Sequence, residues 1–506
     1  MSVAKRIVIE PVTRVEGHGK VVILLDENRK VIQARLHVVE FRGFERFIQG
    51  RPFWEVPVLV QRLCGICPVS HHLAAAKAMD RIVGGENLTP TAEKIRRLMH
   101  YGQMFQSHAL HFFHLASPDL LFGFDADVAI RNVIGVAGKY PDLAVQAVLM
   151  RKYGQEIIKA TAGKKIHGTG AIPGGVNKNL SIAEREVLLK ELDQQIAWSK
   201  AAVKIAKDYT VQNLAKLAPF GSFDSNHLSL VRADGAMDLY HGNLRAIDAQ
   251  GETIFDQVDY QRYVDFIAEE VRDWSYMKFP FIRSIGPEKG WYRVGPLARL
   301  NTASFIDTPL AEAERKEFRK VTADKPSNIT MAYHWARMIE LVHSIEKIQA
   351  LLNDKDLQGT DLVTKGERRE VGIGLIEAPR GTLFHHYKVD KNDQVVSANL
   401  IVSTTNNNEP MNRAVAKVAQ DHLQGVEITE GLLNHVEVAI RAYDPCLSCA
   451  THALGQMPLE VSVVDHQGQV LDSRVRSQSA SPAAERRGRA WKPSEDIGVK
   501  RQRGTE

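Results

Sequence analysis

Hydrophobic and polar positions alternate near the N-terminus, which is the period of a half-buried β-strand. The apolar run 21–25 and the alternating run 31–36 lie on either side of the polar segment 26–30. A polar turn between two such runs is typical of a β-hairpin. We therefore expect a hairpin within residues 1–40.

From residue 67 onward the apolar positions recur every three or four residues, which is the period of an α-helix. Pro68 suits a first helical turn, and Gly84-Gly85 suits a helix end. Ser181-Ile182-Ala183-Glu184 matches a capping box at the start of a long helix. The spacing predicts further helices at about 89–115, 143–162, 181–209, 259–273, 329–353, 410–423 and 428–442.

Turn residues divide other apolar segments into short strands. Between 222 and 255, the dipeptides Asp234-Gly235 and Gln250-Gly251 predict a small β insert. A strand near 371–376 precedes a hairpin that turns at 391–393.

These elements predict a mainly α fold with smaller α/β parts. The helical core is expected at about 57–220 and 259–443, with the β insert at about 222–255. The 506 residues allow roughly three domains, but one large core is also compatible with this length. Hydrophobic residues make up 44% and charged residues 25%, as in ordinary globular proteins.

No apolar run reaches the length of a membrane span, and the N-terminus lacks the apolar segment of a secretory signal. We therefore expect a cytoplasmic chain with no membrane span. The net charge of +5 is located at the C-terminal end, where residues 474–506 hold nine Lys/Arg and four Asp/Glu. Because no aromatic residues alternate with these cations, a disordered tail is favoured over a nucleic-acid site.

The four cysteines form two CxxC pairs, Cys64/Cys67 and Cys446/Cys449. This spacing predicts one four-thiolate site that joins the two ends of the chain. In a reducing compartment such pairs are more often metal ligands or redox centres than disulfides. The first pair precedes a predicted helix, whose N-terminus favours thiolate over thiol.

A structural zinc ion is the commonest occupant of two CxxC pairs. Zinc ribbons, however, bring their pairs together over some tens of residues, whereas 379 residues separate Cys67 from Cys446. Thiolate ligands also suit nickel, copper or iron, so ligand type alone leaves the metal open.

The residues around the cysteines narrow this choice. The chain contains Arg62-x-Cys64-Gly65-x-Cys67-x-x-x-His71 and Asp444-Pro445-Cys446-x-x-Cys449-x-x-His452. Both segments resemble the paired signatures of nickel–iron hydrogenase large subunits. The resemblance covers nearly all of residues 1–473 and includes Arg14-Val15-Glu16-Gly17-His18-Gly19, Phe41-Arg42-Gly43-Phe44-Glu45, Pro173-Gly174-Gly175-Val176 and Glu377-Ala378-Pro379-Arg380-Gly381. Within the family, the sequences of these segments are most similar to those of the soluble NAD-reducing hydrogenases.

The resemblance implies the large-subunit fold, with a core of long helices, and a catalytic subunit that splits H2 reversibly. It implies that Cys64, Cys67, Cys446 and Cys449 bind nickel, and that Cys67 and Cys449 also bridge to an iron with carbon monoxide and cyanide ligands. Cys446 is then the expected proton-accepting base.

The resemblance also implies roles for residues outside the cysteine pairs. Glu16 matches the first proton carrier, Arg380 the arginine above the two metals, and His71 a histidine that hydrogen-bonds a bridging cysteine. Glu45 and His452 match the ligands of a separate Mg²⁺ or Fe²⁺ ion.

Further residues are expected around the metal pair. Ser403, which stands where many relatives have proline, is expected near the cyanide ligands together with Pro379 and Thr404. Ser107 stands where many relatives have aspartate, which puts a carboxylate partner for Arg380 in doubt.

No cysteine remains for an iron–sulfur cluster, and no GxGxxG motif follows a strand. The resemblance therefore implies a small subunit with an iron–sulfur cluster and diaphorase subunits that hold further clusters, FMN and the NAD site. It also implies a nickel chaperone and a maturation endopeptidase that cuts between His452 and Ala453. Residues 1–452 are then the hydrogenase large-subunit domain, and 453–506 are a maturation peptide.

Two other functions stay open from the sequence. A hydrogen-sensing regulatory subunit keeps the same site but usually lacks such an extension. A structural zinc or scaffold subunit related to respiratory quinone reductases is disfavoured by the four thiols.

Overall fold

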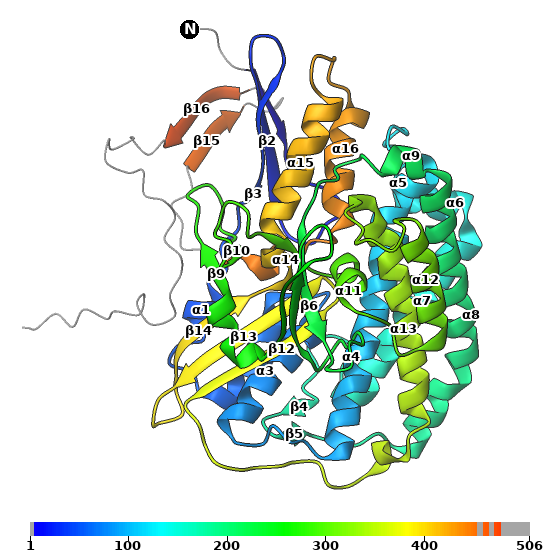
Figure 1. The fold of residues 1–506 in the computed structure, drawn as a ribbon, viewed down its shortest axis with the longest axis vertical. Coiled ribbons are helices and arrows are strands. Elements are labelled where there is room, and N and C mark those ends of the chain that lie inside the picture. The colour runs from blue at the N-terminus through cyan, green and yellow to red at the C-terminus, as the bar shows by residue number, and fades with distance from the viewer. Residues whose placement is uncertain (1–4, 453–458, 465–469, 477–506) are drawn as a thin grey trace, which may run out of the picture.

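The computed structural model describes residues 5–452, 459–464 and 470–476 (Figure 1). An N-terminal antiparallel sheet has the order β1-β2-β3, with the strands Lys5–Ile9, Gly19–Leu25 and Val31–Val38. β2 and β3 form a hairpin around the polar segment 26–30, as the sequence predicts. Alternate positions of β3 are buried, and this strand packs against α15 (Asn408–His422).

Long helices form one side of the molecule (Figure 1). They are α4 (Pro90–Leu110), α7 (Pro141–Ala162), α8 (Ile182–Gln212) and α13 (Tyr333–Leu352). α4 packs against α7 and α13, and α13 packs against α8. The capping box at the start of α8 is present, because Ser181 Oγ accepts from Glu184 N and Glu184 Oε2 accepts from Ser181 N.

The end of α4 differs from a regular helix. It continues as a π-helical segment, His111–Ala116, and then as α5 (Ser117–Phe122). The last long helix before the second cysteine pair is α16 (Glu430–Ala442), which packs against α15.

A three-stranded antiparallel sheet covers α3 (Pro68–Ile82). Its order is β12-β13-β14, with the strands Val371–Ala378, Gly381–Val389 and Val395–Ile401. Helix and sheet approach closely at Gly374, where a Cβ atom would lie 2.0 Å from the carbonyl oxygen of Ala74. This close packing fixes the start of α3 relative to the end of β12.

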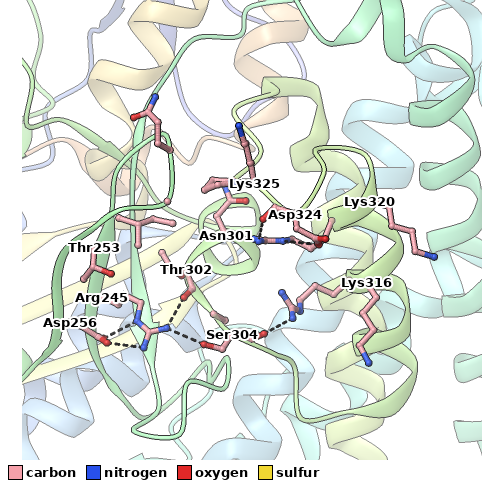
Figure 2. A pocket seen from close by; sticks show the side chains of 17 residues that line it. Arg245, Thr253, Asp256, Asn301, Thr302, Ser304, Lys316, Lys320, Asp324 and Lys325 are labelled. Carbon is pink, nitrogen blue, oxygen red and sulfur yellow. Dashed lines mark hydrogen bonds and ion pairs between the residues drawn. The ribbon is translucent and has the colours of Figure 1, made fainter.

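The β insert forms a sheet with the order β11-β6-β7-β8. Its strands are β6 (Asn226–Val231), β7 (Asn243–Ile247), β8 (Thr253–Val258) and β11 (Tyr292–Arg293). An open hollow separates this insert from α12 (Pro309–Lys320), a helix that the sequence patterns did not predict (Figure 2).

The helix predicted at 259–273 was wrong. The chain forms only short turns, Tyr260–Arg262 and α10 (Tyr263–Phe266), before β9 (Ile267–Glu270). β9 pairs antiparallel with β10 (Phe279–Ile282), and every residue of both strands is buried. Pairing with the next buried strand along the chain outweighs the local helical spacing here.

Several short elements complete the fold. The remaining helices are α1 (Phe44–Phe47), α2 (Val56–Leu59), α6 (Val133–Lys139), α9 (Leu214–Leu217), α11 (Pro296–Thr302) and α14 (Ser403–Asn406). 3-10 turns span Phe53–Glu55, Val60–Leu63, Thr330–Ala332, Lys355–Gln358 and Ser448–Ala450, and a two-stranded ribbon joins β4 (Ala171–Ile172) to β5 (Gly175–Val176).

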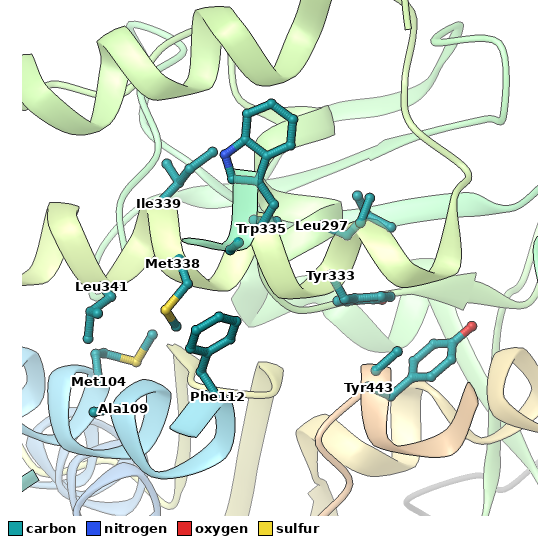
Figure 3. Close-up of a cluster of buried hydrophobic side chains, with 14 of the residues drawn as sticks. Met104, Ala109, Phe112, Leu297, Tyr333, Trp335, Met338, Ile339, Leu341 and Tyr443 are labelled. Atoms are coloured by element: carbon teal, nitrogen blue, oxygen red, sulfur yellow. The ribbon is translucent and has the colours of Figure 1, made fainter. Parts of the chain in front are cut away.

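The largest apolar core extends from the N-terminal sheet across α4, α7, α8 and α13 to α15 and α16. Figure 3 shows Met338 and Leu341 of α13 on the side of Met104 and Phe112, whereas Trp335 points to the opposite side of the helix, where its ring packs on Phe318 of α12. Tyr333 and Tyr443 close the cluster on the side of the second cysteine pair, with ring centroids 4.9 Å apart. None of the helices in the described residues has the length and apolar content needed to cross a membrane.

The predicted tail at 453–506 lies largely outside the described residues. Within it, β15 (Leu459–Val464) and β16 (Val470–Arg476) form an antiparallel pair. Ala453, on one side of the predicted cleavage point, also lies outside the described residues.

Candidate metal centre

The first cysteine pair lies at the start of α3, as predicted. Cys64 follows the 3-10 turn Val60–Leu63, and Cys67 is the N-cap of α3, with Pro68 as its first residue. The Sγ of Cys64 accepts hydrogen bonds from the backbone N–H groups of Ile66 and Cys67, both at 3.1 Å. These donors stabilise a thiolate at Cys64.

The second pair follows α16 through a turn at Asp444, whose φ of 54° lies in the left-handed region. The backbone N–H of Cys446 donates to Thr404 Oγ1 at 3.0 Å, and that of Leu447 donates to the carbonyl oxygen of Glu16 at 2.9 Å. Glu16 and Cys446 form a parallel β-bridge. The second pair is thus held between the N-terminal segment and α14.

All four sulfur atoms meet within 4.8 Å of one another, are buried, and form no disulfide. The Sγ of Cys446 lies 3.2 Å from that of Cys64 and 2.8 Å from that of Cys449, and Cys67 lies 3.8 Å from Cys449. Within the described part of the chain, this is the one group of three or more His, Cys, Asp or Glu side chains placed to hold a metal. The predicted four-thiolate site is therefore present.

The four thiols differ in acidity. Burial alone would raise the pKa of Cys64, but hydrogen bonds from Cys446, Cys449 and Cys67 lower that pKa well below its usual value. Burial raises the pKa of Cys446 and of Cys449 well above the usual value. A bound metal must therefore displace protons from the thiols that ionise less readily. Such a site fits a soft divalent metal bound by thiolates.

A small cavity of about 10 Å³ lies beside Cys67 and Cys446. Its other lining residues are Ser70, His71, Ala378, Pro379, Arg380, Leu383, Val402, Ser403 and Thr404. Five residues predicted around a second metal are thus brought together here: His71, Pro379, Arg380, Ser403 and Thr404. The chemistry of these residues, an arginine and small hydroxyl side chains next to the thiols, is compatible with a second metal that carries small polar ligands.

Glu16 lies directly beside the thiol cluster. Its Oε2 accepts from Cys446 Sγ at 2.9 Å and from the backbone N–H of Ser448 at 3.1 Å. Burial, and then the nearby Cys64 thiolate, raise the pKa of Glu16 above its usual value. A carboxyl with a raised pKa next to a thiol can exchange protons with it.

Arg380 has a carboxylate partner, although the sequence left this in doubt. Its Nη2 donates to Asp444 Oδ1 at 3.0 Å, and its Nε donates to the Asp444 carbonyl oxygen at 2.6 Å. Its Nη1 is buried and has no hydrogen-bond partner among the described residues. Because Arg380 lines the cavity, this N–H group is available to a ligand there.

Ser107 does not take the place of a carboxylate. It is buried in α4, and its hydroxyl has no partner among the described residues. Asp444 was visible in the sequence as the residue two positions before Cys446, but no pattern connected it with Arg380.

Several polar side chains of the cavity have partners in the chain, whereas Ser70 Oγ, like Arg380 Nη1, has none among the described residues. Ser403 Oγ donates to the Gly381 carbonyl oxygen at 2.7 Å, and Thr404 Oγ1 accepts from Cys446 N. His71 Nδ1 lies 3.1 Å from Nε2 of His385, whose Nδ1 lies 2.5 Å from the Tyr387 hydroxyl. A bond from His71 to a bridging cysteine stays a prediction. His385 lies on a buried strand and gave no sequence signal.

Glu45 and His452 belong to a second polar site. His452 is buried, and both ring nitrogens lack a partner among the described residues. Burial lowers the pKa of His452 to about 4, so the ring is neutral and able to bind a metal. Glu45 Oε1 accepts from Lys278 Nζ at 2.9 Å and from Leu400 N at 2.8 Å. Lys278, which sequence reasoning missed, already compensates part of the Glu45 charge.

Comparisons with known proteins were made for the whole chain. A family model described as nickel-dependent hydrogenase matches residues 42–129 and 211–452, and a model described as HoxL-like matches residues 6–41.

Curated relatives match over most of the chain. The β subunit of the NAD-reducing hydrogenase HoxS of Cupriavidus necator is 50% identical over 492 residues, which cover 94% of this chain and 100% of that protein. One subunit of the F420-non-reducing hydrogenase of Methanothermobacter thermautotrophicus is 42% identical over 474 residues, which cover 92% of this chain and 99% of that protein.

Solved structures match as well. A crystal structure of NAD+-reducing [NiFe]-hydrogenase in the H2-reduced state is 56% identical, with a TM-score of 0.87, and the match covers 88% of this chain and 99% of that chain. The Ni-Fe-Se hydrogenase from D. vulgaris Hildenborough shares the fold, with a TM-score of 0.72 at 22% identity over 89% and 100% of the two chains.

Proposed function

The chain belongs to the nickel-dependent hydrogenases as a large subunit, and on this premise we propose how its residues split H2 and deliver the electrons to NAD+. The chain is the catalytic subunit of a [NiFe] hydrogenase. The observation that carries the proposal is the cluster of four buried thiols next to Glu16 and Arg380. The 50% identity to a subunit of an NAD-reducing hydrogenase over that whole protein supports NAD+ as the acceptor.

The four cysteines hold the metals. Cys64 and Cys446 would hold the nickel, and Cys67 and Cys449 would hold both the nickel and the iron. When bound, the nickel–iron group with its carbon monoxide and cyanide ligands supplies the site at which H2 is split and its electrons are taken up. Pro379, Ser403 and Thr404 line the space for the diatomic ligands, and His71 supports the thiolates from the second layer.

Cys446 and Glu16 move the proton. Cys446 Sγ takes up a proton as the basic atom and passes it to Glu16 Oε2, 2.9 Å away. The Ser448 N–H holds the receiving oxygen in place. The raised pKa of Glu16 lets this carboxylate accept the proton and later release it toward solvent.

Arg380 provides a fixed positive charge at the cavity. Asp444 fixes the guanidinium through two hydrogen bonds, which leaves Nη1 without a partner among the described residues. A preorganised donor of this kind stabilises charge that develops during a reaction without a cost of reorganisation.

Glu45 and His452 bind a separate Mg²⁺ or Fe²⁺ ion. The buried, neutral His452 ring without partners supports this assignment. The Lys278 ammonium shares the Glu45 carboxylate, so a weakly charged divalent site with water ligands is expected.

The electrons leave through other subunits. All four cysteines are committed to one site in this chain, so a small subunit supplies an iron–sulfur cluster and diaphorase subunits supply FMN, further clusters and the NAD site. A nickel chaperone and an endopeptidase act before the complex is complete, in the cytoplasm. Cleavage after His452 is supported by the end of the family-model match at residue 452.

The test is H2-dependent reduction of NAD+ by the purified complex, together with metal analysis. We expect one nickel per large subunit and turnover with NAD+. A complex that contains nickel and reduces only artificial dyes with H2 would point instead to a hydrogen-sensing protein. A chain that holds zinc in place of nickel would refute the catalytic function.

A further inference from the structure

An open hollow of about 820 Å³ lies between the β insert and α12, apart from the metal centre (Figure 2). Its walls come from β7, β8, the end of α11, α12 and the segment 324–326. None of its lining residues lines the cavity beside Cys67. Neither proton transfer nor metal binding uses this hollow.

Positive charge predominates on its walls. Two acidic residues, Asp256 and Asp324, face six basic ones: Arg245, Arg315, Lys316, Arg319, Lys320 and Lys325. Figure 2 shows Lys316 and Lys320 on one side of the hollow, Lys325 at another edge, and Arg245 with Asp256 opposite.

Some of these cations are already paired. Arg245 forms two hydrogen bonds with Asp256, at 2.8 and 2.9 Å. Arg315 pairs with Glu312, and Lys320 pairs with Glu317. These three cations therefore contribute little net charge to the hollow.

Two lysines and one arginine remain weakly compensated. Lys316 and Lys325 are exposed, and their ammonium groups have neither a hydrogen bond nor an ion pair within the described residues. Arg319 Nη2 donates to the backbone carbonyl oxygen of Asp324, whereas its Nε reaches the Asp324 carboxylate only at 3.9 Å. Burial, and then the positive charge of Arg315, lower the pKa of Arg319. This repulsion between cations is relieved when an anion lies among them.

The rest of the lining offers contacts to a small molecule rather than to a flat protein surface. Thr253 and Ser304 supply hydroxyl groups, and Ile247 and Pro326 supply an apolar wall. A ligand with two or three negative charges and a compact apolar part matches this combination.

We propose that the hollow binds a small anion with adjacent phosphate groups, of the nucleoside diphosphate class. Its phosphates lie among Lys316, Lys325 and Arg319, and its base packs on Ile247 and Pro326. Lysine side chains are flexible point charges that suit phosphate, so the two free ammonium groups close on the ligand.

The experiment measures the reactivity of individual lysines of this chain in the purified complex. Because each lysine is quantified separately, phosphate binding to partner subunits does not affect the result. The amines are acetylated briefly and quantified by mass spectrometry, with no ligand, with inorganic pyrophosphate, or with ADP, all at equal ionic strength. Pyrophosphate should slow acetylation of Lys316 and Lys325 by at least about threefold. Each ammonium group would then make one charge-assisted contact with the ligand, and this contact shields the amine from the reagent. ADP should protect at lower concentration than pyrophosphate if the apolar wall takes part.

Lys190 and Lys200 on α8 are the internal controls, because both are exposed and distant in sequence from the hollow. Lys320, which also lines the hollow, should be protected more weakly than Lys316 and Lys325 in the natural chain. This protection of Lys320 should be lost in a Lys316→Gln/Lys325→Gln variant and kept in a Lys190→Gln/Lys200→Gln variant. Equal protection of all these lysines would reduce the effect to ionic screening and overturn the proposal. Lys316 and Lys325 that are unreactive in the complex without ligand would also overturn it, because a partner subunit then covers the hollow.

Discussion

Glu16 Oε2 lies 2.9 Å from Cys446 Sγ, although 430 residues separate the two in the chain. The contact is fixed twice, because the backbone N–H of Leu447 donates to the Glu16 carbonyl oxygen and that of Ser448 donates to its carboxylate. The distance between base and proton carrier is therefore set by backbone geometry and does not depend on side-chain rotamers alone.

Replacing Glu16 by Gln should leave nickel and iron content unchanged but reduce H2/D+ exchange by about 10²–10⁴-fold, the usual contribution of a positioned general acid or base. The amide keeps the shape and the Ser448 contact but cannot accept the proton. Glu10→Gln, at an exposed position before the same motif, is the matched control. Full exchange in Glu16→Gln would remove this residue from the proton path.

The pH dependence follows from the same carboxyl. Glu16 accepts a proton only when ionised, and its pKa is raised above 4.5 by burial and by the nearby Cys64 thiolate. H2 oxidation should therefore rise with pH through a midpoint above 4.5. Rates measured from pH 4 to 9 should show this acidic limb in the natural enzyme, and an identical limb in Glu16→Gln would assign it to another group.

Asp444 positions Arg380. Asp444→Ala removes the ion pair at Oδ1 and should lower H2 oxidation about 10–100-fold with metals retained, because the guanidinium loses its fixed orientation. Asp444→Asn keeps the acceptor and should retain more activity than the alanine variant. Asp421→Asn, which changes only an exposed pair with Lys417, should behave as the natural chain. Equal activity of the alanine and asparagine variants would argue against orientation as the cause.

The proposed Mg²⁺ site depends on the Glu45 carboxylate. Glu45→Gln should lower the magnesium or iron bound outside the active site, measured by elemental analysis of the dialysed complex, while nickel stays near one per subunit. Loss of a negative charge weakens a hard cation site directly. Glu55→Gln nearby is exposed and should change neither metal. Unchanged magnesium in Glu45→Gln would place the ion elsewhere.

A buried ion pair makes the stability of the folded chain depend on pH in the acidic range. Burial alone would raise the pKa of Glu340, but Arg299 and His108 lower it to about 2. The folded pKa lies below the unfolded value of 4.5, so this stabilisation is present above pH 4.5 and is lost as the pH falls toward 2.

Glu340→Gln should therefore be less stable by about 3–5 kcal/mol near neutral pH, since it leaves Arg299 with Glu377 as its remaining carboxylate. The stability difference from the natural chain should shrink between pH 4.5 and 3 in denaturant titrations. Glu314→Gln removes only a surface pair with Lys207 and serves as the control. A constant difference over that pH range would show that Glu340 does not titrate as expected.

Local patterns were sufficient for the longest helices, α4, α7, α8 and α13, but not for α12. Ser181 and Glu184 mark the start of α8, and Pro68 marks the start of α3, because capping and proline act within a few residues. The strand β9 could not be predicted in this way. It is stabilised by pairing with β10, which lies beyond a turn and therefore outside the short segment in which the periodicity of β9 is read.

The same difference holds for the site. The CxxC spacing predicted the four thiols, because the two metal ligands of each pair lie within four residues of each other in the sequence. Other side chains meet only because elements far apart in the sequence pack together. These contacts are Asp444 with Arg380, His385 with His71, and Lys278 with Glu45. Periodicity and motif spacing carry no information about such contacts.

The separation of the two cysteine pairs also sets the order of events during synthesis. Cys64 and Cys446 are 382 residues apart, and their sulfurs end 3.2 Å from each other. At about 5–20 residues per second, a ribosome needs roughly 20–80 s to reach the second pair after the first has been made. The first two thiols therefore exist for that time in a nascent chain that has no partner for them. Any metal that they bind early is held by half of the final ligands, which leaves it open to exchange until the last segment of the chain arrives.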